Sequence, residues 1–379
     1  MAGLYIHIPF CKQACSYCDF YFLTRQQLRE PFVDALIEEI HSYENTAYAS
    51  EAVSTIYIGG GTPSLLSPEQ LNRIFDALDR VFKLTPEEVT MELNPDDVTV
   101  DYLKSIREAG INRASMGVQS FQEELLTFMH RAHTRQEAFK ALEALGKAGF
   151  ETFTADLIYG NPGQTDQMLK EDVANLLTFN PPHISAYSLT IEPGTRLGKQ
   201  AELGRLQIPD DEDTGRQFNL LGDLLRTAGI ERYEVSNYSK PGKEAIHNSS
   251  YWNHENYLGF GPSAHSFWKD DTGARRWRNR PDLKFYLENE TEQFREDEEA
   301  LDKKTLAEER LMLGLRTRWG VATAELEEKY GYRLNSIQTE WLQAKRNEGM
   351  IADTEEKLLL KHEGLKIADH LIVELLRRG

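Results

Sequence analysis

The chain has 379 residues, 40% hydrophobic side chains and a formal net charge of −18. Its length exceeds one typical domain, and its hydrophobic content is sufficient for a buried core. The acidic balance argues against nucleic acid or an anionic membrane surface as the main partner, and no apolar run is long enough to span a bilayer.

The first predicted element is a strand at residues 4–8, directly after Met1-Ala2-Gly3. No secretory signal precedes this strand, so we expect a cytoplasmic protein. A reducing cytoplasm also suits free thiols and an oxygen-sensitive cofactor.

All three cysteines follow this strand within eight positions, as Cys11, Cys15 and Cys18 at the spacing C-x3-C-x2-C. Three thiolates on one loop can hold a [4Fe-4S] cluster and leave its fourth iron open to another ligand. Structural zinc would need a fourth ligand, and the nearest candidate, His7, lies within the predicted strand. A disulfide would leave an odd thiol, and inert core cysteines would not cluster at ligand spacing.

Apolar, β-branched segments alternate with amphipathic helical patterns up to about residue 190. The predicted strands are residues 4–8, 53–58, 88–93, 113–118, 152–158 and 183–189. The predicted helices are residues 31–43, 68–82, 99–108, 122–130, 135–148 and 165–179. Six such repeats imply parallel strands with right-handed crossovers, and eight would make a full TIM barrel. Ligands are then expected at the carboxyl ends of the strands.

Polar or glycine-rich residues follow each predicted strand at that end. The second strand runs into Gly59-Gly60-Gly61-Thr62-Pro63, while Glu92, Gln119 and Asp156 lie at the ends of the next three. Glycines let the backbone approach a ligand closely and expose N–H donors that suit a carboxylate. A tight turn is the alternative, although it needs fewer glycines. The segment is not a phosphate loop, because no Gly-Lys-Ser/Thr follows.

A less regular extension is expected at residues 196–300, with a helix at 211–228 and one strand at 231–238. It contains His247-Asn248-Ser249-Ser250-Tyr251-Trp252 and, soon afterwards, the aromatic and glycine-rich segment 257–266 with a second histidine. A lone histidine here is most often structural. The aromatic crowding favours a planar ligand, and histidine is a common axial ligand of haem iron. The basic run at residues 275–280 is interpreted as a solvated loop, with contact to an acidic ligand as the alternative.

The last part of the chain changes to mostly charged helices. Helices are predicted at residues 306–315, 322–330, 335–347 and 365–376, with a β-hairpin formed by 349–353 and 357–361. This order resembles a winged-helix domain. DNA binding is poorly supported, because the third helix carries only Lys345 and Arg346 as basic residues. We therefore expect a lid or docking module.

These motifs resemble the HemN/HemW branch of the radical S-adenosylmethionine (SAM) superfamily. The resemblance covers nearly the whole chain and is carried by residues 5–20, 59–63, 92, 115–121 and 156–164. It implies an α/β fold with a partial (β/α)6 TIM-like barrel of the radical SAM type at residues 1–195. An extension at 196–300 and a small, mostly helical winged-helix-like domain at 301–379 complete the expected organisation.

The resemblance also implies the ligands of the site. Cys11, Cys15 and Cys18 would hold the [4Fe-4S] cluster, with SAM on the open iron. The positions that match SAM contacts are Tyr5, Gly60, Gly61, Thr62, Glu92, Gln119, Arg131 and Asp156. Arg131 matches by spacing more than by motif, and without the resemblance it would be read as an exposed helix residue.

Three features favour the HemW side of the branch. Phe20 stands where the dehydrogenase has a fourth cysteine, and the chain begins almost directly at its first strand. His247 opens a match to the H-N-x-x-Y-W motif of HemW, whose histidine is implicated in haem binding. The HemW side implies a haem chaperone with no catalytic residue. It would deliver haem to proteins such as respiratory enzymes, which can be membrane-associated, and it is compatible with a monomer–dimer equilibrium.

The other side of the branch stays open as an alternative. It implies an oxygen-independent coproporphyrinogen III dehydrogenase that uses the same SAM positions to decarboxylate porphyrinogen propionates. A radical SAM enzyme acting on some other substrate is a third possibility.

Overall fold

The computed structural model spans residues 1–379 and describes all of them except 353 and 355. Each of the six predicted strands is present, with ends that shift by a few residues. They are β1 (Ala2–Ile8), β2 (Ala52–Gly60), β3 (Lys83–Leu93), β4 (Arg113–Gln119), β5 (Phe153–Tyr159) and β6 (His183–Ser188). The helices between them are α1 (Arg29–His41), α2 (Pro68–Val81), α3 (Val100–Glu108), α4 (Glu123–Phe128), α5 (Arg135–Ala148) and α6 (Asp166–Leu177).

Local sequence explains where several of these helices begin. Ser67 precedes α2 and forms a capping box with Gln70, followed by a proline at the first helical position. Thr134 and Glu137 form the same reciprocal pair at the start of α5. Gly149 ends α5 in the left-handed conformation. These capping signals set where α2 begins and where α5 begins and ends, and so they set the lengths of the loops that join these helices to the strands.

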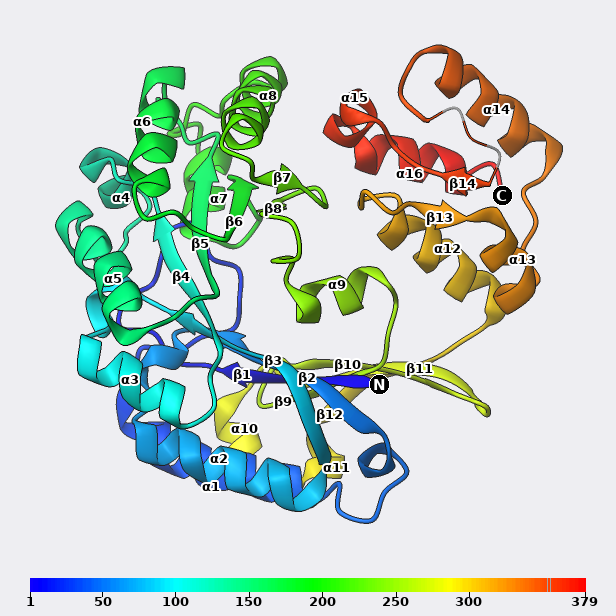
Figure 1. Cartoon of the computed structure of the whole chain (residues 1–379). Helices are drawn as coiled ribbons and strands as arrows, with labels where there is room; N and C mark the ends of the chain where they lie inside the picture. Colours follow the sequence, from blue (N-terminus) through cyan, green and yellow to red (C-terminus); the bar gives the residue numbers. More distant parts are fainter. Residues whose placement is uncertain (353, 355) are drawn as a thin grey trace.

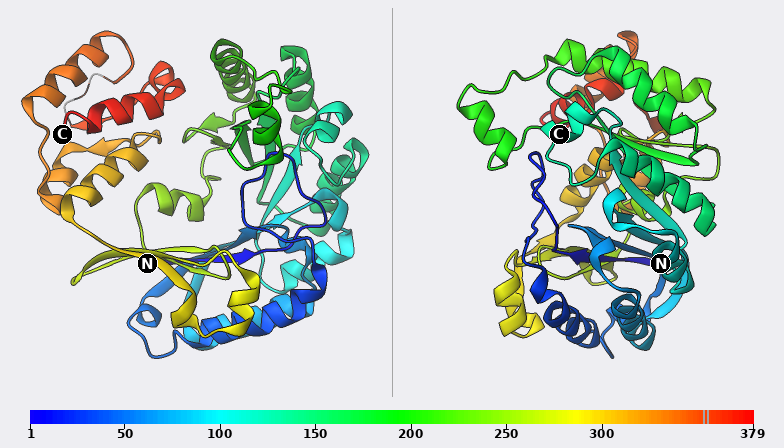
Figure 2. Two further views of the ribbon diagram at one scale, coloured as in Figure 1. Left: turned by 180° about the vertical axis from the view of Figure 1, so that it is seen from behind. Right: turned by 90° about the vertical axis from the view of Figure 1, so that its left-hand side faces the viewer.

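One twelve-stranded sheet runs through the larger part of the molecule, in the order β12-β11-β10-β9-β1-β2-β3-β4-β5-β6-β8-β7. The strands β1 to β6 are parallel in sequence order, and β9 adds a seventh parallel strand beside β1. Figures 1 and 2 show this sheet curving into an incomplete barrel with helices on its outer face. The expected α/β partial barrel of the radical SAM type is confirmed.

The extension contributes the remaining strands. They are β7 (Glu231–Arg232), β8 (Asn237–Ser239), β9 (Tyr257–Phe260), β10 (His265–Asp270), β11 (Gly273–Asn279) and β12 (Arg295–Leu301). Its helices are α7 (Arg196–Glu202), α8 (Asp211–Thr227), α9 (Ile246–Trp252), α10 (Leu283–Glu288) and α11 (Thr291–Phe294). Figure 1 shows α9 lying on the inner side of the curved sheet.

Two expectations for the extension are wrong. Residues 231–238 do not form one strand, because the Glu234 carboxylate accepts a hydrogen bond from the Ser236 amide and folds the chain into two short antiparallel strands. The basic run is not a solvated loop, because it forms β11 between β10 and β12. Trp277 of this run is buried in the core, and the arginines alternate with it along the strand.

The last region contains α12 (Lys303–Gly314), α13 (Thr323–Tyr330), α14 (Ser336–Asn347), α15 (His362–Lys366) and α16 (Ala368–Leu376). The small sheet pairs β13 (Val321–Ala322) with β14 (Lys357–Leu358). The expected hairpin is reduced to an isolated bridge between Ile351 and Leu360, and residue 353 of that prediction lies outside the described residues. The mostly helical character of this region is confirmed.

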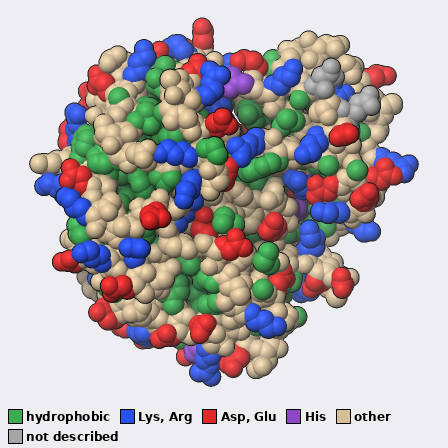
Figure 3. Space-filling view, in the orientation of Figure 1, with side chains coloured by type: hydrophobic (Ala, Val, Ile, Leu, Met, Phe, Trp, Pro, Cys, Tyr) green, Lys and Arg blue, Asp and Glu red, His purple; other side chains and the backbone are tan. Residues whose placement is uncertain are grey.

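Surface charges are mixed on the face that Figure 3 draws. Lys and Arg side chains alternate there with Asp and Glu, and small apolar patches lie between them. Among the described residues, no helix is long and apolar enough to cross a membrane.

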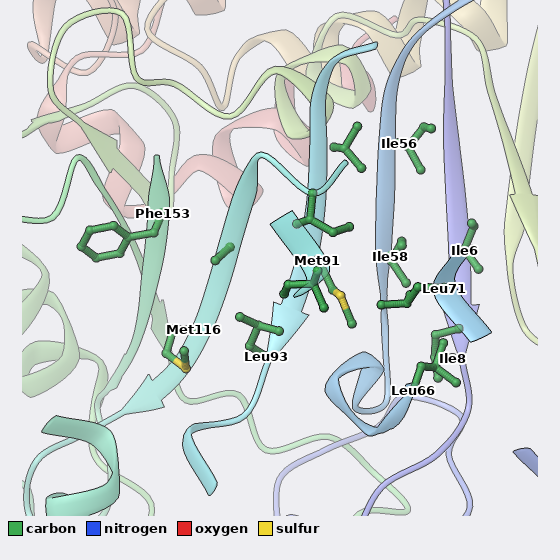
Figure 4. Close-up of a cluster of buried hydrophobic side chains, with 14 of the residues drawn as sticks. Ile6, Ile8, Ile56, Ile58, Leu66, Leu71, Met91, Leu93, Met116 and Phe153 are labelled. Atoms are coloured by element: carbon green, nitrogen blue, oxygen red, sulfur yellow. The ribbon is translucent and has the colours of Figure 1, made fainter. Parts of the chain in front are cut away.

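The main hydrophobic core lies between the sheet and its outer helices. Figure 4 shows Ile6, Ile8, Ile56 and Ile58 on neighbouring strands, with Leu71 of α2 packed against them. A second buried cluster joins residues of the C-terminal helices, such as Leu311 and Leu371, to Phe267, Ala274 and Leu301 of β10, β11 and β12. The chain boundaries expected at residues 195 and 300 stay predictions.

Candidate functional site

A cavity of about 520 Å³ lies on the inner side of the sheet, at the carboxyl ends of the parallel strands. The cysteine loop forms one wall, and inward residues of β2 to β6 form the others. Its lining includes Cys11, Cys15, Cys18, Gly60, Gly61, Thr62, Glu92, Gln119, Arg131 and Asp156. Apart from Tyr5 and His247, all residues predicted for the site thus meet in one cavity.

The cysteine loop is held to the rim by backbone hydrogen bonds. The Cys11 amide donates to the carbonyl of Leu23, 2.9 Å away, which ties the two ends of the loop together. In the middle of the loop, Ser16 donates from its amide to Met129 and accepts from the amide of Leu197. The loop is therefore shaped by the protein itself, so the thiols are positioned before any ligand binds.

Two of the three thiols accept hydrogen bonds from site residues. The Thr62 hydroxyl lies 3.5 Å from Cys11 Sγ, and Arg131 Nη1 lies 3.3 Å from Cys15 Sγ. Burial raises the pKa of Cys11 to about 11 and that of Cys18 to about 12. Thiolates at these positions therefore need a positive centre beside them.

The arrangement of the cysteines fits a cluster better than a single ion. Across the described part of the chain, no three His, Cys, Asp or Glu side chains converge closely enough to hold one metal ion. In a [4Fe-4S] cluster each thiolate binds a different iron, so the sulfurs stand further apart than around one ion. The thiols are half-buried, and two of them accept hydrogen bonds, which is compatible with a cluster in this loop.

Steric contacts explain the glycines that follow β2. A Cβ on Gly61 would lie 2.7 Å from the carbonyl oxygens of Ile8 and Phe10, and one on Gly60 would meet the His7 ring. The N–H groups here are already used, since Gly60 donates to Glu92 and Gly61 to Ile8. The expectation of free N–H donors is therefore wrong for Gly60 and Gly61, whose role is close packing of β2 against the cysteine loop.

Two carboxyl groups face the cavity without a cationic partner. Glu92 accepts hydrogen bonds from the Tyr57 hydroxyl at 2.8 Å and the Gly60 amide at 3.0 Å. Burial raises the pKa of Glu92 to about 7, and burial together with the Glu92 charge raises that of Asp156 to about 7. Neither forms an ion pair within the residues the structure describes. They are suited to a cationic or hydroxyl-bearing ligand, and SAM offers both kinds of group.

Gln119 and Arg131 complete the wall beside β4. Gln119 ends that strand with a φ of 65°, an uncommon conformation for a residue with a side chain. Arg131 donates to Asn94 at 2.7 Å and to the Gly117 carbonyl at 3.0 Å, in addition to Cys15. Arg131 is therefore part of the cavity wall and not an exposed helix residue.

Tyr5 lies behind the cavity wall. Its ring stacks on Tyr57, with 6.1 Å between centroids, and its hydroxyl lies 3.1 Å from His7 Nδ1. Tyr57, which sequence reasoning missed, occupies the cavity surface in front of it. The signal was available, since Tyr57 alternates with buried residues along β2 and faces the same side as Gly59.

His247 lies in the protein interior and is fully buried. Its Nδ1 is 2.8 Å from the Thr55 hydroxyl, its Nε2 is 2.7 Å from the Tyr251 hydroxyl, and its ring stacks on Tyr57. Burial lowers its pKa to about 3, so the ring is neutral. Its neighbour Asn248 lines the cavity instead.

A buried ion pair below the cavity was also missed. Arg113 and Glu88 lie 3.3 Å apart, and Glu88 accepts from the amides of Ile246 and His247 at 3.0 and 2.9 Å. Arg113 lines the cavity floor. The pair ties the start of α9 to the sheet. Opposite charges on two predicted strands were the available signal, but the segment that they hold comes more than a hundred residues later.

Family models of known proteins match the barrel and the C-terminal region of the chain. The Radical SAM superfamily model matches residues 5–176, and the HemN C-terminal domain model matches residues 301–367. The protein named heme chaperone HemW from Bacillus subtilis is 37% identical over 96% of this chain and 96% of its own length. The heme chaperone HemW from Lactococcus lactis is 35% identical over 98% of this chain and 96% of its own length.

Among solved structures, that of coproporphyrinogen III oxidase (HemN) from Escherichia coli superposes with a TM-score of 0.83. It covers 100% of this chain and 89% of that chain, at 23% identity. This likeness concerns the fold.

Proposed function

Because this chain belongs to the HemW family of the radical SAM superfamily, we propose that it is a haem chaperone that holds a [4Fe-4S] cluster and SAM and delivers haem to recipient proteins. The proposal is carried by the 37% and 35% sequence identity to two heme chaperones over nearly the full length of the chain. The absence of a fourth thiol supports it: Phe20, 65% exposed, occupies that position at the cavity wall.

The cavity residues divide between the two bound groups. Cys11, Cys15 and Cys18 would hold the cluster, whose open iron binds the amino acid end of SAM when both are present. Glu92 is suited to the SAM amino group, because a carboxylate with no other cation is available there. Asp156 of β5 and Gln119 of the neighbouring strand β4 are suited to bind the ribose hydroxyls of SAM.

Arg131 has a double role in this proposal. Its guanidinium contacts Cys15 and closes the wall beside β4, so it would compensate negative charge on the cluster and contact SAM from the same side. Thr62 would act in the same way on Cys11 through its hydroxyl.

The proposal extends to the partners of the chain. We place its action in the cytoplasm, with haem as cargo and haem proteins such as respiratory enzymes as recipients. A monomer–dimer equilibrium would let one copy exchange haem while another is loaded.

Anaerobic reconstitution followed by separate additions of haem and SAM tests this function. We expect a haem Soret band, SAM retained by the cluster-loaded protein, and transfer of haem to an apo-haem protein. Cys15→Ala should lose the cluster and SAM. Lys140→Ala, at an exposed position of α5, is the control and should retain both.

The same preparation distinguishes the alternative. Incubation with SAM, a reductant and coproporphyrinogen III would give vinyl products if the chain were a dehydrogenase. Vinyl products together with absent haem binding would replace the chaperone by the dehydrogenase.

A further inference from the structure

Asn94 lies between the two side chains that donate hydrogen bonds to the cysteine thiols. It directly follows β3, and it lines the cavity together with Thr62 and Arg131. Arg131 Nη2 lies 2.7 Å from Asn94 Oδ1, and Asn94 Nδ2 lies 3.4 Å from Thr62 Oγ1. The roles proposed above for the cavity residues leave Asn94 without one.

The donors and acceptors of these groups fix the direction of each hydrogen bond. A guanidinium only donates, so the Asn94 oxygen faces Arg131 and the Asn94 nitrogen faces Thr62. The Thr62 oxygen accepts from that nitrogen, and its single proton is then free for Cys11 Sγ, 3.5 Å away. On the other side, Nη1 of the same guanidinium lies 3.3 Å from Cys15 Sγ. One amide thus orients a donor toward each of two thiols.

The backbone on both sides of Asn94 holds its side chain in this place. The Asn94 amide donates to Ser64 Oγ at 3.2 Å, and its carbonyl accepts from the Asp97 amide at 3.1 Å. Pro95 follows, and a residue before proline favours an extended conformation, which Asn94 has with φ −96° and ψ 141°. None of these bonds uses the Asn94 side chain, so substitutions that change only the side chain should leave the turn intact.

Close packing leaves the Arg131 guanidinium few other positions. Its Nη2 also donates to the Gly117 carbonyl at 3.0 Å, and a Cβ on Gly117 would lie 3.2 Å from that nitrogen and 3.6 Å from Asn94 Oδ1. Arg131 Nε is buried without a hydrogen-bond partner in the described chain, so the two terminal nitrogens set the orientation of the guanidinium. Among the partners of these two nitrogens, Asn94 Oδ1 is the nearest.

We propose that Asn94 is a positioning residue that sets the reduction potential of the cluster through Thr62 and Arg131. This role rests on the [4Fe-4S] cluster of the proposed function. Hydrogen bonds to ligating sulfurs stabilise negative charge on them, and the reduced form of a cluster carries one more electron. The two donors that Asn94 orients therefore favour the reduced form and raise the potential.

An amide at position 94 serves both neighbours, whereas a carboxylate serves only one. A carboxylate would accept from Arg131 as before, but it has no donor for Thr62. The Thr62 proton would then turn from Cys11 to the carboxylate. Asn94→Asp therefore keeps the shape of the side chain and removes one donor from the sulfurs, whereas Asn94→Ala removes the support of both donors.

Redox titration of the reconstituted full chain, followed by EPR of the reduced cluster, measures this role. At a fixed potential near the wild-type midpoint, Asn94→Ala should lower the ratio of reduced to oxidised cluster by about tenfold, a shift of about 59 mV for one electron. The iron content per chain should stay that of wild type, because the three thiols are unchanged. Asn72→Ala, at an exposed position of α2, is the matched control and should keep the wild-type potential.

Asn94→Asp separates the hydrogen bond from the charge. The added negative charge lowers the potential by itself, and the reversed Thr62 hydroxyl lowers it further. The ratio of reduced to oxidised cluster should fall by about tenfold or more in the wild-type background. In a Thr62→Val background no hydroxyl can reverse, so the same substitution should lower the ratio by only about threefold. Asn72→Asp is the control for a remote charge and should change neither.

The two backgrounds also decide against the proposal. Equal shifts of Asn94→Asp in both, or a wild-type potential in Asn94→Ala, would overturn the role of Asn94 and leave the haem-chaperone function standing. Loss of the cluster in both Asn94 variants would show a purely structural residue and overturn the role as well. If the wild-type chain binds no cluster, the proposed function and this role fail together.

Discussion

At the scale of single residues, the two carboxyl groups of the cavity are its most unusual chemistry. Glu92 on β3 and Asp156 on β5 face the same cavity with β4 between their strands, and each would repel the other if both were ionised. Without a cation in the cavity, the protein holds them partly protonated near neutral pH. A cationic ligand in the cavity would favour the ionised form of both carboxyl groups.

We expect Glu92→Gln to stabilise the cluster-free protein more at pH 8 than at pH 5. In the folded chain Glu92 keeps its proton up to about pH 7, whereas in the unfolded chain its pKa is near 4.5. The folded state therefore binds more protons between these values, and its stability falls as pH rises through them. Removing the carboxyl should cancel a loss on the order of 2–3 kcal/mol.

Thermal unfolding of both proteins across this pH range measures the effect. Glu124→Gln, at an exposed position of α4, is the control and should shift the curves equally at all pH values. An unchanged difference between wild type and Glu92→Gln at pH 5 and pH 8 would contradict the expectation.

The residue scale also shows where sequence reasoning stops. Three cysteines at fixed spacing and a glycine run after a strand are local signals, and the structure brings both to the wall of one cavity. Whether an N–H is free or a histidine is accessible depends on partners far along the chain. His247 is bonded to Thr55, a residue 192 positions earlier, so its burial could not be read from the motif.

At the scale of elements, the start of α9 is attached to the sheet by Glu88 of β3 and Arg113 of β4. The Glu88 carboxylate accepts from the first amides of the helix, and Arg113 donates to the carbonyls of Lys243 and Glu244 just before it. These groups are buried, so each depends on the other for its hydrogen bonds. The position of Asn248 on the cavity floor follows from this attachment.

Glu88→Ala should release α9 and cost about 3–5 kcal/mol of unfolding free energy, because Arg113 is left buried without its counter-charge. Hydrogen exchange should rise at the amides of residues 246–252 before it rises elsewhere. Glu87→Ala changes the exposed neighbour on the same strand and serves as control. Equal exchange in the two variants would show that the pair does not hold α9.

Strands and helices of the barrel were predictable because each has its own periodic pattern and capping residues. The extension was harder, since the short strands β7 and β8 join the sheet beside β6 in the reverse of their sequence order, and β9 pairs with β1 from far along the chain. The arginine run illustrates this. Its charges suggest solvent, yet Trp277 between them packs in the core and makes the segment a strand.

At the scale of the whole molecule, the C-terminal helices pack on Phe267, Ala274 and Leu301 of β10 to β12, and polar contacts add to this junction. Arg310 of α12 pairs with Glu325 at 3.2 Å and donates to the carbonyl of Trp252, while His254 lies 3.1 Å from Glu309. These contacts reach the end of α9 from the C-terminal side. The C-terminal region thus touches the helix that forms the cavity floor.

Core substitutions in the two clusters should act on different parts of the chain. Leu311→Ala should cost about 2–5 kcal/mol and speed hydrogen exchange in α12 to α16, while β1 to β6 stay protected. Leu78→Ala, an equally buried residue of the main core, is the matched counterpart and should do the reverse. Uniform exchange changes across the chain in both variants would show a single cooperative unit.

The curved sheet described above never closes on itself, and this has a mechanical consequence. In a closed barrel, strand number and shear fix the radius, so the interior can change little in width. Here the two ends of the sheet, β7 and β12, have no hydrogen bonds joining them to each other. We therefore expect the two ends of the sheet to move apart or together without loss of strand pairing, so that the enclosed volume adapts to occupants of different size. Small-angle scattering with and without ligand would measure that compliance as a change in the radius of gyration.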